Sequence, residues 1–198
     1  MKFHDIAHKT RKPAYPIADI FYTRWSPRAM TGEPLTKEEL LPLFEAARWA
    51  PSSYNGQPWR FVVATAPKEK ELFMSFLVEF NQQWCKNASA LVVICARKNF
   101  EHNNSPNPHH VFDTGSAWVS LALEGARRGL VVHGMAGYDQ EKVRKGLHIP
   151  AEYDIAAMCA IGKFADPSVL PPEIAKTEGP NQRKTVDEIV GWGKFSWK

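Results

Sequence analysis

The chain reads Arg24-Trp25-Ser26-Pro27-Arg28 and then, one helix later, Ala50-Pro51-Ser52-Ser53-Tyr54-Asn55-Gly56-Gln57-Pro58-Trp59-Arg60-Phe61-Val62-Val63. The first piece places two cations and a hydroxyl within five residues, a composition that suits a phosphate group. The second piece is a loop of small hydroxyl and amide side chains that leads into an apolar strand. Such side chains offer both donors and acceptors, which suits a flat ring with heteroatoms at its edge. Together the two pieces indicate a bound flavin mononucleotide (FMN).

The rest of the composition is that of one ordinary globular domain. A length of 198 residues is common for a single domain, and a hydrophobic content of 44% is enough for a core. The formal net charge of +4 comes from 25 basic and 21 acidic residues spread along the chain. Because no basic run stands out, nucleic acid is not expected as a partner, whereas the mild positive balance favours an anionic cofactor or nucleotide.

The cysteines and the apolar runs bear on where the protein works. Cys85, Cys95 and Cys159 lie far apart with no CxxC pair, a pattern that favours a reducing, intracellular compartment. The first residues contain no apolar run of the kind that signal peptides carry. The longest apolar run, 90–96, is far shorter than the ~20 residues that span a membrane. We therefore expect a cytoplasmic protein with no membrane partner.

Hydrophobic periodicity predicts a mixture of helices and strands. Thr36 and Glu39 form a capping box, and apolar residues at helical spacing follow as far as Ala50, where Pro51 ends the helix. The run 90–96 is apolar at every position, so this strand should be buried on both faces. The further elements expected are strands at 59–64, 130–133 and 155–161, and helices at 17–23, 67–80, 113–128 and from Asp139 onward.

Both ends of the chain differ in composition from its middle. Residues 1–16 are polar and basic and are expected to form an N-terminal arm. Residues 165–182 hold four prolines and little apolar periodicity, so they should run over a surface. The apolar residues beyond them need something to pack on, either this domain or a second subunit. No internal repeat or linker stands out, so we expect residues 1–198 to form a single domain.

Five pieces of the sequence resemble the nitroreductase family of FMN-dependent flavoproteins. The Arg-x-Ser-x-Arg box at 24–28 and the loop at 51–59 are the specific ones, in this order and spacing. The weaker pieces are Phe80-Asn81 before an apolar strand, Gly129-Leu130 followed by His133-Gly134-Met135-Ala136-Gly137-Tyr138-Asp139, and Arg183-Lys184. The resemblance covers roughly residues 17–190.

The resemblance implies an α+β, nitroreductase-like fold with a central, mostly antiparallel sheet flanked by helices. It also implies a homodimer with two FMN sites at the subunit interface. In that family the C-terminal tail crosses to the partner and adds an edge strand, so the extension 165–198 is expected to pack on the partner subunit. The prolines and the apolar end of this extension agree with such a crossing.

The cations of the box are expected to bind the FMN phosphate. Arg24 and Arg28 flank Ser26 and can form a cationic clamp with the hydroxyl between them. Each charge-assisted hydrogen bond is worth about 1.5–3 kcal/mol. By resemblance, Arg183 and Lys184 close the clamp from the other end of the chain. The alternative from the residues alone is a pair of surface arginines in a proline-containing turn.

The remaining expected contacts are to the ring and the ribityl chain of FMN. Hydroxyls and amides of the 51–57 loop suit the heteroatoms, although the same residue types also make an ordinary turn. By resemblance, Asn81 donates to the pyrimidine edge, and Gly134 and Gly137 let the backbone lie close to the ring. The full set of expected FMN-binding residues is Arg24, Trp25, Ser26, Arg28, Pro51, Ser52, Ser53, Asn55, Gln57, Asn81, Gly134, Met135, Gly137, Arg183 and Lys184.

The resemblance implies an oxidoreductase that takes a hydride from NADH or NADPH and reduces an electron-poor small molecule such as a nitroaromatic or a quinone. No side chain needs to act as a nucleophile, because the chemistry takes place at the flavin, and no metal site is expected. Ala136 and Trp84 stand where some members carry an acidic residue and a lysine, which should alter the redox potential and the preferred reductant. The alternatives are other flavin chemistry on this fold, as in a dehydrogenase or a dehalogenase, and a non-catalytic protein that binds or stores flavin.

Overall fold

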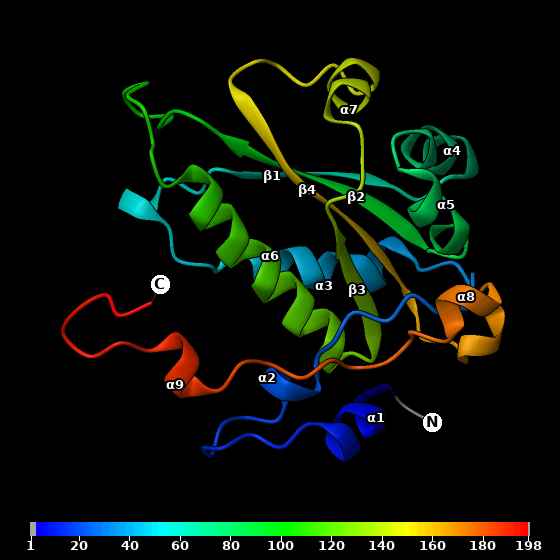
Figure 1. Cartoon of the computed structure of the whole chain (residues 1–198). Helices are drawn as coiled ribbons and strands as arrows, with labels where there is room; N and C mark the ends of the chain where they lie inside the picture. Colours follow the sequence, from blue (N-terminus) through cyan, green and yellow to red (C-terminus); the bar gives the residue numbers. More distant parts are fainter. Residues whose placement is uncertain (1–2, 198) are drawn as a thin grey trace.

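A four-stranded sheet forms the centre of the protein in the computed structural model, which describes residues 3–197 (Figure 1). The strands stand in the order β1-β2-β4-β3, and every neighbouring pair is antiparallel. Their bounds are β1 Trp59–Ala64, β2 Ala90–Arg97, β3 Leu130–Met135 and β4 Tyr153–Lys163. The predicted α+β class with an antiparallel sheet is confirmed, and each strand lies where the sequence predicts one.

Helices cover both faces of this sheet, which gives the molecule three layers (Figure 1). Their bounds are α3 Lys37–Arg48, α4 Pro67–Ser75, α5 Glu79–Cys85, α6 His110–Arg127, α7 Gln140–Gly146 and α8 Pro172–Ala175. α3 and α6 pack on one face, and α4, α5, α7 and α8 pack on the other. Val92 and Ile94 of β2 belong to the first of these cores, whereas Leu91 and Val93 belong to the second. The prediction that β2 is buried on both faces is therefore confirmed.

The capping box places the start of α3 where the sequence predicts it. The Thr36 hydroxyl accepts from the Glu39 amide at 3.2 Å, and the Glu39 carboxylate accepts from the Thr36 amide at 2.7 Å. Two amides that the first helical turn leaves without a partner are thereby satisfied. Leu40 and Leu43 then pack in the core that α3 shares with α6.

The helix predicted at 67–80 is wrong in one respect, because the chain breaks it into α4 and α5. Between the two helices, the Val78 amide donates to the Gly137 carbonyl at 3.1 Å. Backbone pairing with this distant turn outweighs the local helix preference. As a result, Phe80 does not share the buried face of Phe73 and Phe76 and is 50% exposed.

The segment 1–16, predicted as an arm, contains a helix that packs on the domain. This helix, α1, spans Phe3–Thr10, and its Phe3 and Ala7 are buried beside the end of α6. Two apolar side chains one helical turn apart give α1 a buried face in spite of its polar composition. The next element along the chain is α2, Ile20–Thr23.

The C-terminal extension packs on its own chain over its first half. A 3-10 turn, η2 at Pro167–Val169, and the helix α8 bring Leu170 and Ile174 into the core. The prediction that 165–182 only runs over a surface is therefore wrong, because two apolar side chains are enough to anchor the segment. The last helix, α9, spans Val186–Ile189, and most large apolar side chains from there on are exposed.

The three cysteines are free and buried. Burial raises the pKa of Cys95 to about 11 and that of Cys159 to about 12, so both thiols stay protonated. Cys159 of β4 is fully buried and packs as a core residue. Across residues 3–197, no helix is both long enough and apolar enough to cross a bilayer.

Candidate functional site

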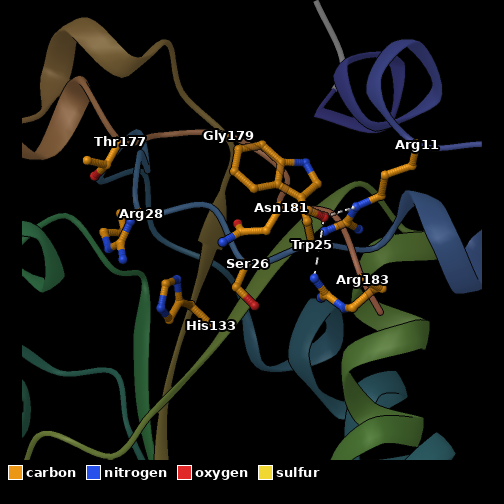
Figure 2. Close-up of a pocket in the computed structure, with 9 residues that line it drawn as sticks. All are labelled: Arg11, Trp25, Ser26, Arg28, His133, Thr177, Gly179, Asn181 and Arg183. Carbon is orange, nitrogen blue, oxygen red and sulfur yellow. Dashed lines mark hydrogen bonds between the residues drawn. The ribbon is translucent and has the colours of Figure 1, made fainter. Parts of the chain in front are cut away.

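A cavity of about 370 Å³ opens where the two ends of the chain meet (Figure 2). Its walls come from the residue after α1, the segment after α2, strand β3 and the segment after α8. The fold thereby brings the predicted box at 24–28 together with the predicted C-terminal cation Arg183. The lining residues are Arg11, Trp25, Ser26, Arg28, His133, Thr177, Gly179, Asn181 and Arg183.

A second cavity of about 560 Å³ adjoins the first and shares Arg11 and Arg183 with it. Arg24 and Lys184 line this second space rather than the first. The four cations that the resemblance assigns to one phosphate clamp are therefore distributed over two neighbouring cavities, with Arg183 common to both.

Three arginines cluster where the two cavities meet. Arg24 donates through Nη1 to the Ser26 hydroxyl at 3.2 Å. Burial lowers the pKa of Arg24, and the positive charge of Arg183 lowers it further. The pKa of Arg11 is lowered by burial and then by the charges of Arg183 and Arg24. Within residues 3–197, none of the three guanidinium groups has a carboxylate at ion-pair distance, so a bound anion would relieve their mutual repulsion.

Arg28 takes a different partner from the other cations of the box. Its Nη1 lies 3.6 Å from Oε2 of Glu178, whose side chain is only 1% exposed. Oε1 of Glu178 also accepts from the amides of Arg28 at 2.6 Å and Ala29 at 3.0 Å. The predicted clamp of Arg24 and Arg28 is therefore divided, because a buried carboxylate compensates only the second charge. Figure 2 shows Arg28 on the opposite side of the cavity from Arg183.

His133 of β3 lines the cavity, although it is not among the expected FMN-binding residues. Its Nδ1 donates to the Pro27 carbonyl at 2.9 Å, because a carbonyl can only accept, and this leaves Nε2 as an acceptor. Burial lowers the pKa of His133 to about 4, and the charges of Arg28 and Arg24 act in the same direction. The ring is therefore neutral near pH 7. The signal in the sequence is a polar side chain that interrupts an apolar strand.

Asn81, a predicted ring contact, is buried in a network with the 133–137 segment. Its Nδ2 donates to the Gly137 carbonyl at 3.0 Å, and its Oδ1 accepts from Nε1 of Trp84 at 3.2 Å. The Trp84 ring in turn lies 4.5 Å from the His133 ring, measured between centroids. Trp84 thus supports both Asn81 and His133.

The predicted glycine contacts have a packing reason of their own. A Cβ at Gly134 would lie 2.9 Å from the Trp118 ring, and a Cβ at Gly137 would lie 2.7 Å from the Asn81 amide nitrogen. Both glycines are therefore required by close contacts within the chain. Met135 between them is buried, with its Sδ 3.3 Å from Sγ of Cys85.

The loop 51–57 lies away from the cavity and has a strained backbone. It contains a 3-10 turn, η1 at Ser53–Asn55, and the φ angles of Tyr54, Asn55 and Gln57 are +50°, +54° and +44°. Left-handed backbone of this kind is costly for residues other than glycine and is often found at functional sites. The loop is held by the Asp113 carboxylate, which accepts from the Ser53 amide at 3.0 Å.

Asp113 also corrects the predicted start of α6. The sequence predicts Asp113 at the start of this helix, but α6 begins at His110 and the Asp113 side chain is buried in its first turn. Its partner is the 51–57 loop rather than its own helix. This contact ties the loop to the N-terminal end of α6.

The two halves of the predicted site lie at opposite ends of α6 (Figure 1). Asp113 holds the loop at the first turn, whereas Trp25 of the cationic box packs near Ala126 in the last turn. Thirteen residues separate Asp113 from Ala126, which corresponds to about 20 Å of helix at 1.5 Å per residue. No residue of the 51–57 loop lines the cavity within one chain.

Comparison with known proteins identifies relatives along most of the chain. The model of the nitroreductase family matches residues 22–163. The Bacillus subtilis protein "Putative NAD(P)H nitroreductase YdgI" is 42% identical over 198 aligned residues, which cover 80% of this chain and 88% of that protein. The "Oxygen-insensitive NADPH nitroreductase" of Helicobacter acinonychis is 42% identical over 76 residues, or 38% of this chain and 35% of its own length.

Solved structures agree with this assignment. A crystal structure of an oxidoreductase containing FMN superimposes with a TM-score of 0.90 at 40% identity, over 95% of this chain and 97% of that one. A nitroreductase family protein from Clostridium difficile shares the fold, with a TM-score of 0.71 at 18% identity over 91% of this chain and 100% of the other. On the family match, the identity over most of the chain and the common fold, this chain belongs to the nitroreductase family.

Proposed function

We propose that this chain is an FMN-dependent oxidoreductase that works as a homodimer. It takes a hydride from NADH or NADPH and reduces an electron-poor small molecule such as a nitroaromatic or a quinone. The observation that carries the proposal is the cluster of Arg11, Arg24 and Arg183 beside the cavity, none of which has a carboxylate partner among the described residues. Related proteins named as NAD(P)H nitroreductases, and a related structure that contains FMN, support this choice of cofactor and reductant.

The residues at the cavity fit the phosphate end of FMN. A phosphate monoester carries close to two negative charges at pH 7. Arg24, Arg183 and the Ser26 hydroxyl supply two cations and one further hydrogen-bonding group around the space where the cavities meet. The described part of the chain supplies no negative charge to pair with these arginines, and a bound phosphate would supply it. Lys184 adds a further cation on the outer side.

The second half of the site is proposed to come from a second copy of the chain. Within one chain the 51–57 loop stands at the far end of α6, and its Tyr54 is 88% exposed. Phe112 on the first turn of α6 and Trp49 after α3 are also exposed, at 77% and 73%. A surface with several large exposed apolar side chains is typical of a protein interface. Because the loop and the cavity lie at opposite ends of α6, two copies packed with their α6 helices antiparallel would place the loop of one beside the cavity of the other.

The end of the C-terminal extension is proposed to complete this dimer. Residues after Lys184 leave Ile189, Trp192 and Phe195 exposed at 60%, 89% and 82%. We therefore expect residues 186–198 to pack on the partner, while the segment before them stays on its own chain. A chain truncated after Lys184 keeps Arg183 and should be monomeric in sedimentation equilibrium, whereas the full chain should be dimeric. A dimeric truncated chain would contradict this part of the proposal.

Bound FMN supplies the hydride chemistry, and the task of the chain is to bind, orient and shield it. The arginine cluster anchors one end of the cofactor. His133 lines the cavity and is held by its Nδ1 bond to the Pro27 carbonyl, and Asn81 and Trp84 hold the 133–137 segment in place. No nucleophilic side chain is needed for this reaction. The free, buried cysteines fit a reducing compartment, so we propose a cytoplasmic location.

Absorption spectroscopy and rapid mixing test this function. The purified full chain should carry the yellow absorption band of flavin, with one FMN per chain. Mixing with NADH and, separately, with NADPH under anaerobic conditions should bleach the band much faster than free FMN in the same buffer. A subsequent mix with a nitroaromatic or a quinone should restore it. A band that never bleaches faster than free FMN would instead indicate flavin storage.

A further inference from the structure

We infer that Arg11, directly after α1, is a third arginine of the phosphate subsite and fixes the position of the other two. The inference rests on the proposed function and extends it to a segment outside the matched family region, which begins at residue 22. It gives the N-terminal helix a role in binding a phosphate monoester.

Arg11 is buried and joins three parts of the chain. Only 7% of the Arg11 surface is exposed to solvent. Nε donates to the Asn181 carbonyl at 2.8 Å, and Nη1 donates to the carbonyls of Tyr22 and Arg24, both at 3.0 Å. One guanidinium group thus holds the backbone on either side of the cavity. Figure 2 shows its hydrogen bond to Asn181, close to Arg183.

The partners of Arg11 are all neutral, which leaves its charge uncompensated. The three hydrogen bonds use carbonyl oxygens and leave Nη2 without a hydrogen-bond partner among residues 3–197. The charges that lower the pKa of Arg11 are those of Arg183 and Arg24, which have the same sign as its own. A buried cation beside two other cations is unfavourable unless an anion is present. A group that served only to hold the backbone would not need this charge.

The position of Arg11 depends on α1 and on the C-terminal segment. Phe3 and Ala7 anchor α1 in the core cluster with Trp25 and Ala126. Gln182 adds a hydrogen bond from its Nε2 to the Thr10 carbonyl at 2.7 Å, next to Arg11. The two ends of the chain are therefore fastened together at the phosphate subsite, and a bound phosphate should stabilise this junction.

Titration of flavin fluorescence with FMN and with riboflavin tests the inference. The two ligands differ only in the phosphate, so the ratio of their dissociation constants reports the phosphate contribution. Arg11→Gln should reduce this preference for FMN by roughly 10- to 100-fold, the loss expected for one charge-assisted contact. Lys9→Gln, which removes an exposed cation two residues earlier, should leave the preference unchanged.

Arg11→Lys keeps the charge but cannot reproduce the guanidinium bonds to three carbonyls. It should lose part of the preference, about fivefold to tenfold. It also serves as the test if Arg11→Gln fails to fold, as judged by circular dichroism. An unchanged preference for FMN in the folded Arg11 variants would overturn the inference and leave the proposed function intact.

Inorganic phosphate provides a measurement that does not depend on flavin. Millimolar phosphate should raise the thermal unfolding temperature of the flavin-free protein and of Lys9→Gln, and should raise it much less for Arg11→Gln. This result supports an anion site that includes Arg11 even if FMN is not the natural ligand. If the unmodified chain responds neither to FMN nor to phosphate, both the proposed function and the role of Arg11 are wrong.

Discussion

The two ends of α6 hold the two halves of the proposed site, and they are built on opposite principles. At the C-terminal end, segments from both ends of the chain bring together three arginines whose charges are not compensated within the described residues. At the N-terminal end, a single short loop is exposed and uncharged, and it carries a strained backbone. The C-terminal end of α6 thus has repulsion between like charges, and the N-terminal end has a strained backbone.

The difference indicates how each half is completed. Uncompensated charge is relieved by a small anion, so we propose the arginine end as the ligand-binding half within a single chain. An exposed, strained loop is held ready for a contact that one chain does not provide. The cofactor is therefore expected to join the electrostatic half of one copy to the loop of another.

Removing the charge should have the largest effect on cofactor binding. In the pair of changes Arg24→Ala and Arg183→Ala, two charge-assisted contacts are lost, which corresponds to about 3–6 kcal/mol or roughly 100- to 10,000-fold in FMN affinity. The purified variant should be colourless by absorbance yet folded by circular dichroism. The control is Lys142→Ala with Lys145→Ala, two exposed cations on α7. Full FMN retention in the arginine variant would place the phosphate elsewhere.

Acid should weaken the arginine half through His133. Its pKa is about 4 in the folded chain and about 6.5 in the unfolded one. The unfolded chain therefore takes up the proton first, so stability is lost as the pH falls from 6.5 to 4, by on the order of 3 kcal/mol, and this loss is complete below pH 4.

Urea unfolding of the flavin-free protein at pH 7 and pH 4 measures this effect. His133→Gln removes the titrating ring, so the variant should lose less stability than the unmodified chain between the two pH values. Other groups titrate in both proteins and cancel in the comparison. An equal loss in both proteins would show that His133 is not buried in its neutral form.

Much of the fold could be predicted from the sequence, because its signals are local. The capping box at Thr36 gives the start of α3, and the uninterrupted apolar run in β2 gives a strand with two buried faces. The break between α4 and α5 could not be predicted, since Val78 there pairs with Gly137, 59 residues away. The helix propensity of a segment does not depend on such a distant partner.

The site could be predicted only in part, for the same reason. The cations of the box at 24–28 and Arg183 could be identified from the sequence, and the fold brings them to two adjoining cavities rather than to one. That Glu178 neutralises Arg28 and not Arg24 depends on a contact across 150 residues. Arg11 lies in a segment whose polar composition predicts a surface position. Only its three hydrogen bonds to backbone carbonyls indicate its place in the proposed site.

A smaller effect is expected at the loop end. Asp113→Ala removes the carboxylate that accepts from the Ser53 amide and should lower the free energy of unfolding by about 1–3 kcal/mol. Limited proteolysis near Tyr54 should become faster. Inorganic phosphate should raise the thermal unfolding temperature of the flavin-free variant as much as that of the unmodified chain, because the arginines stay in place. A smaller rise in the variant would mean that the two ends of α6 are not independent.

The smallest expected effect tests the strain itself. Tyr54 has a φ of +50°, a conformation that costs a residue other than glycine about 1–2 kcal/mol. Tyr54→Gly relieves the strain and Tyr54→Ala keeps it. The glycine variant should therefore be more stable than the alanine variant by about 1 kcal/mol in urea unfolding. An alanine variant that is equally stable would mean that the loop is not strained.

The fastening of residue 182 to residue 10 has a consequence for biosynthesis. A ribosome delivers the amino end first, so all four strands are made before residue 183. Arg183 can join Arg24 only after these strands have been made. A nascent chain that has not reached residue 183 therefore lacks one of the cations proposed to anchor its coenzyme. Premature termination before this codon would yield a folded but empty product.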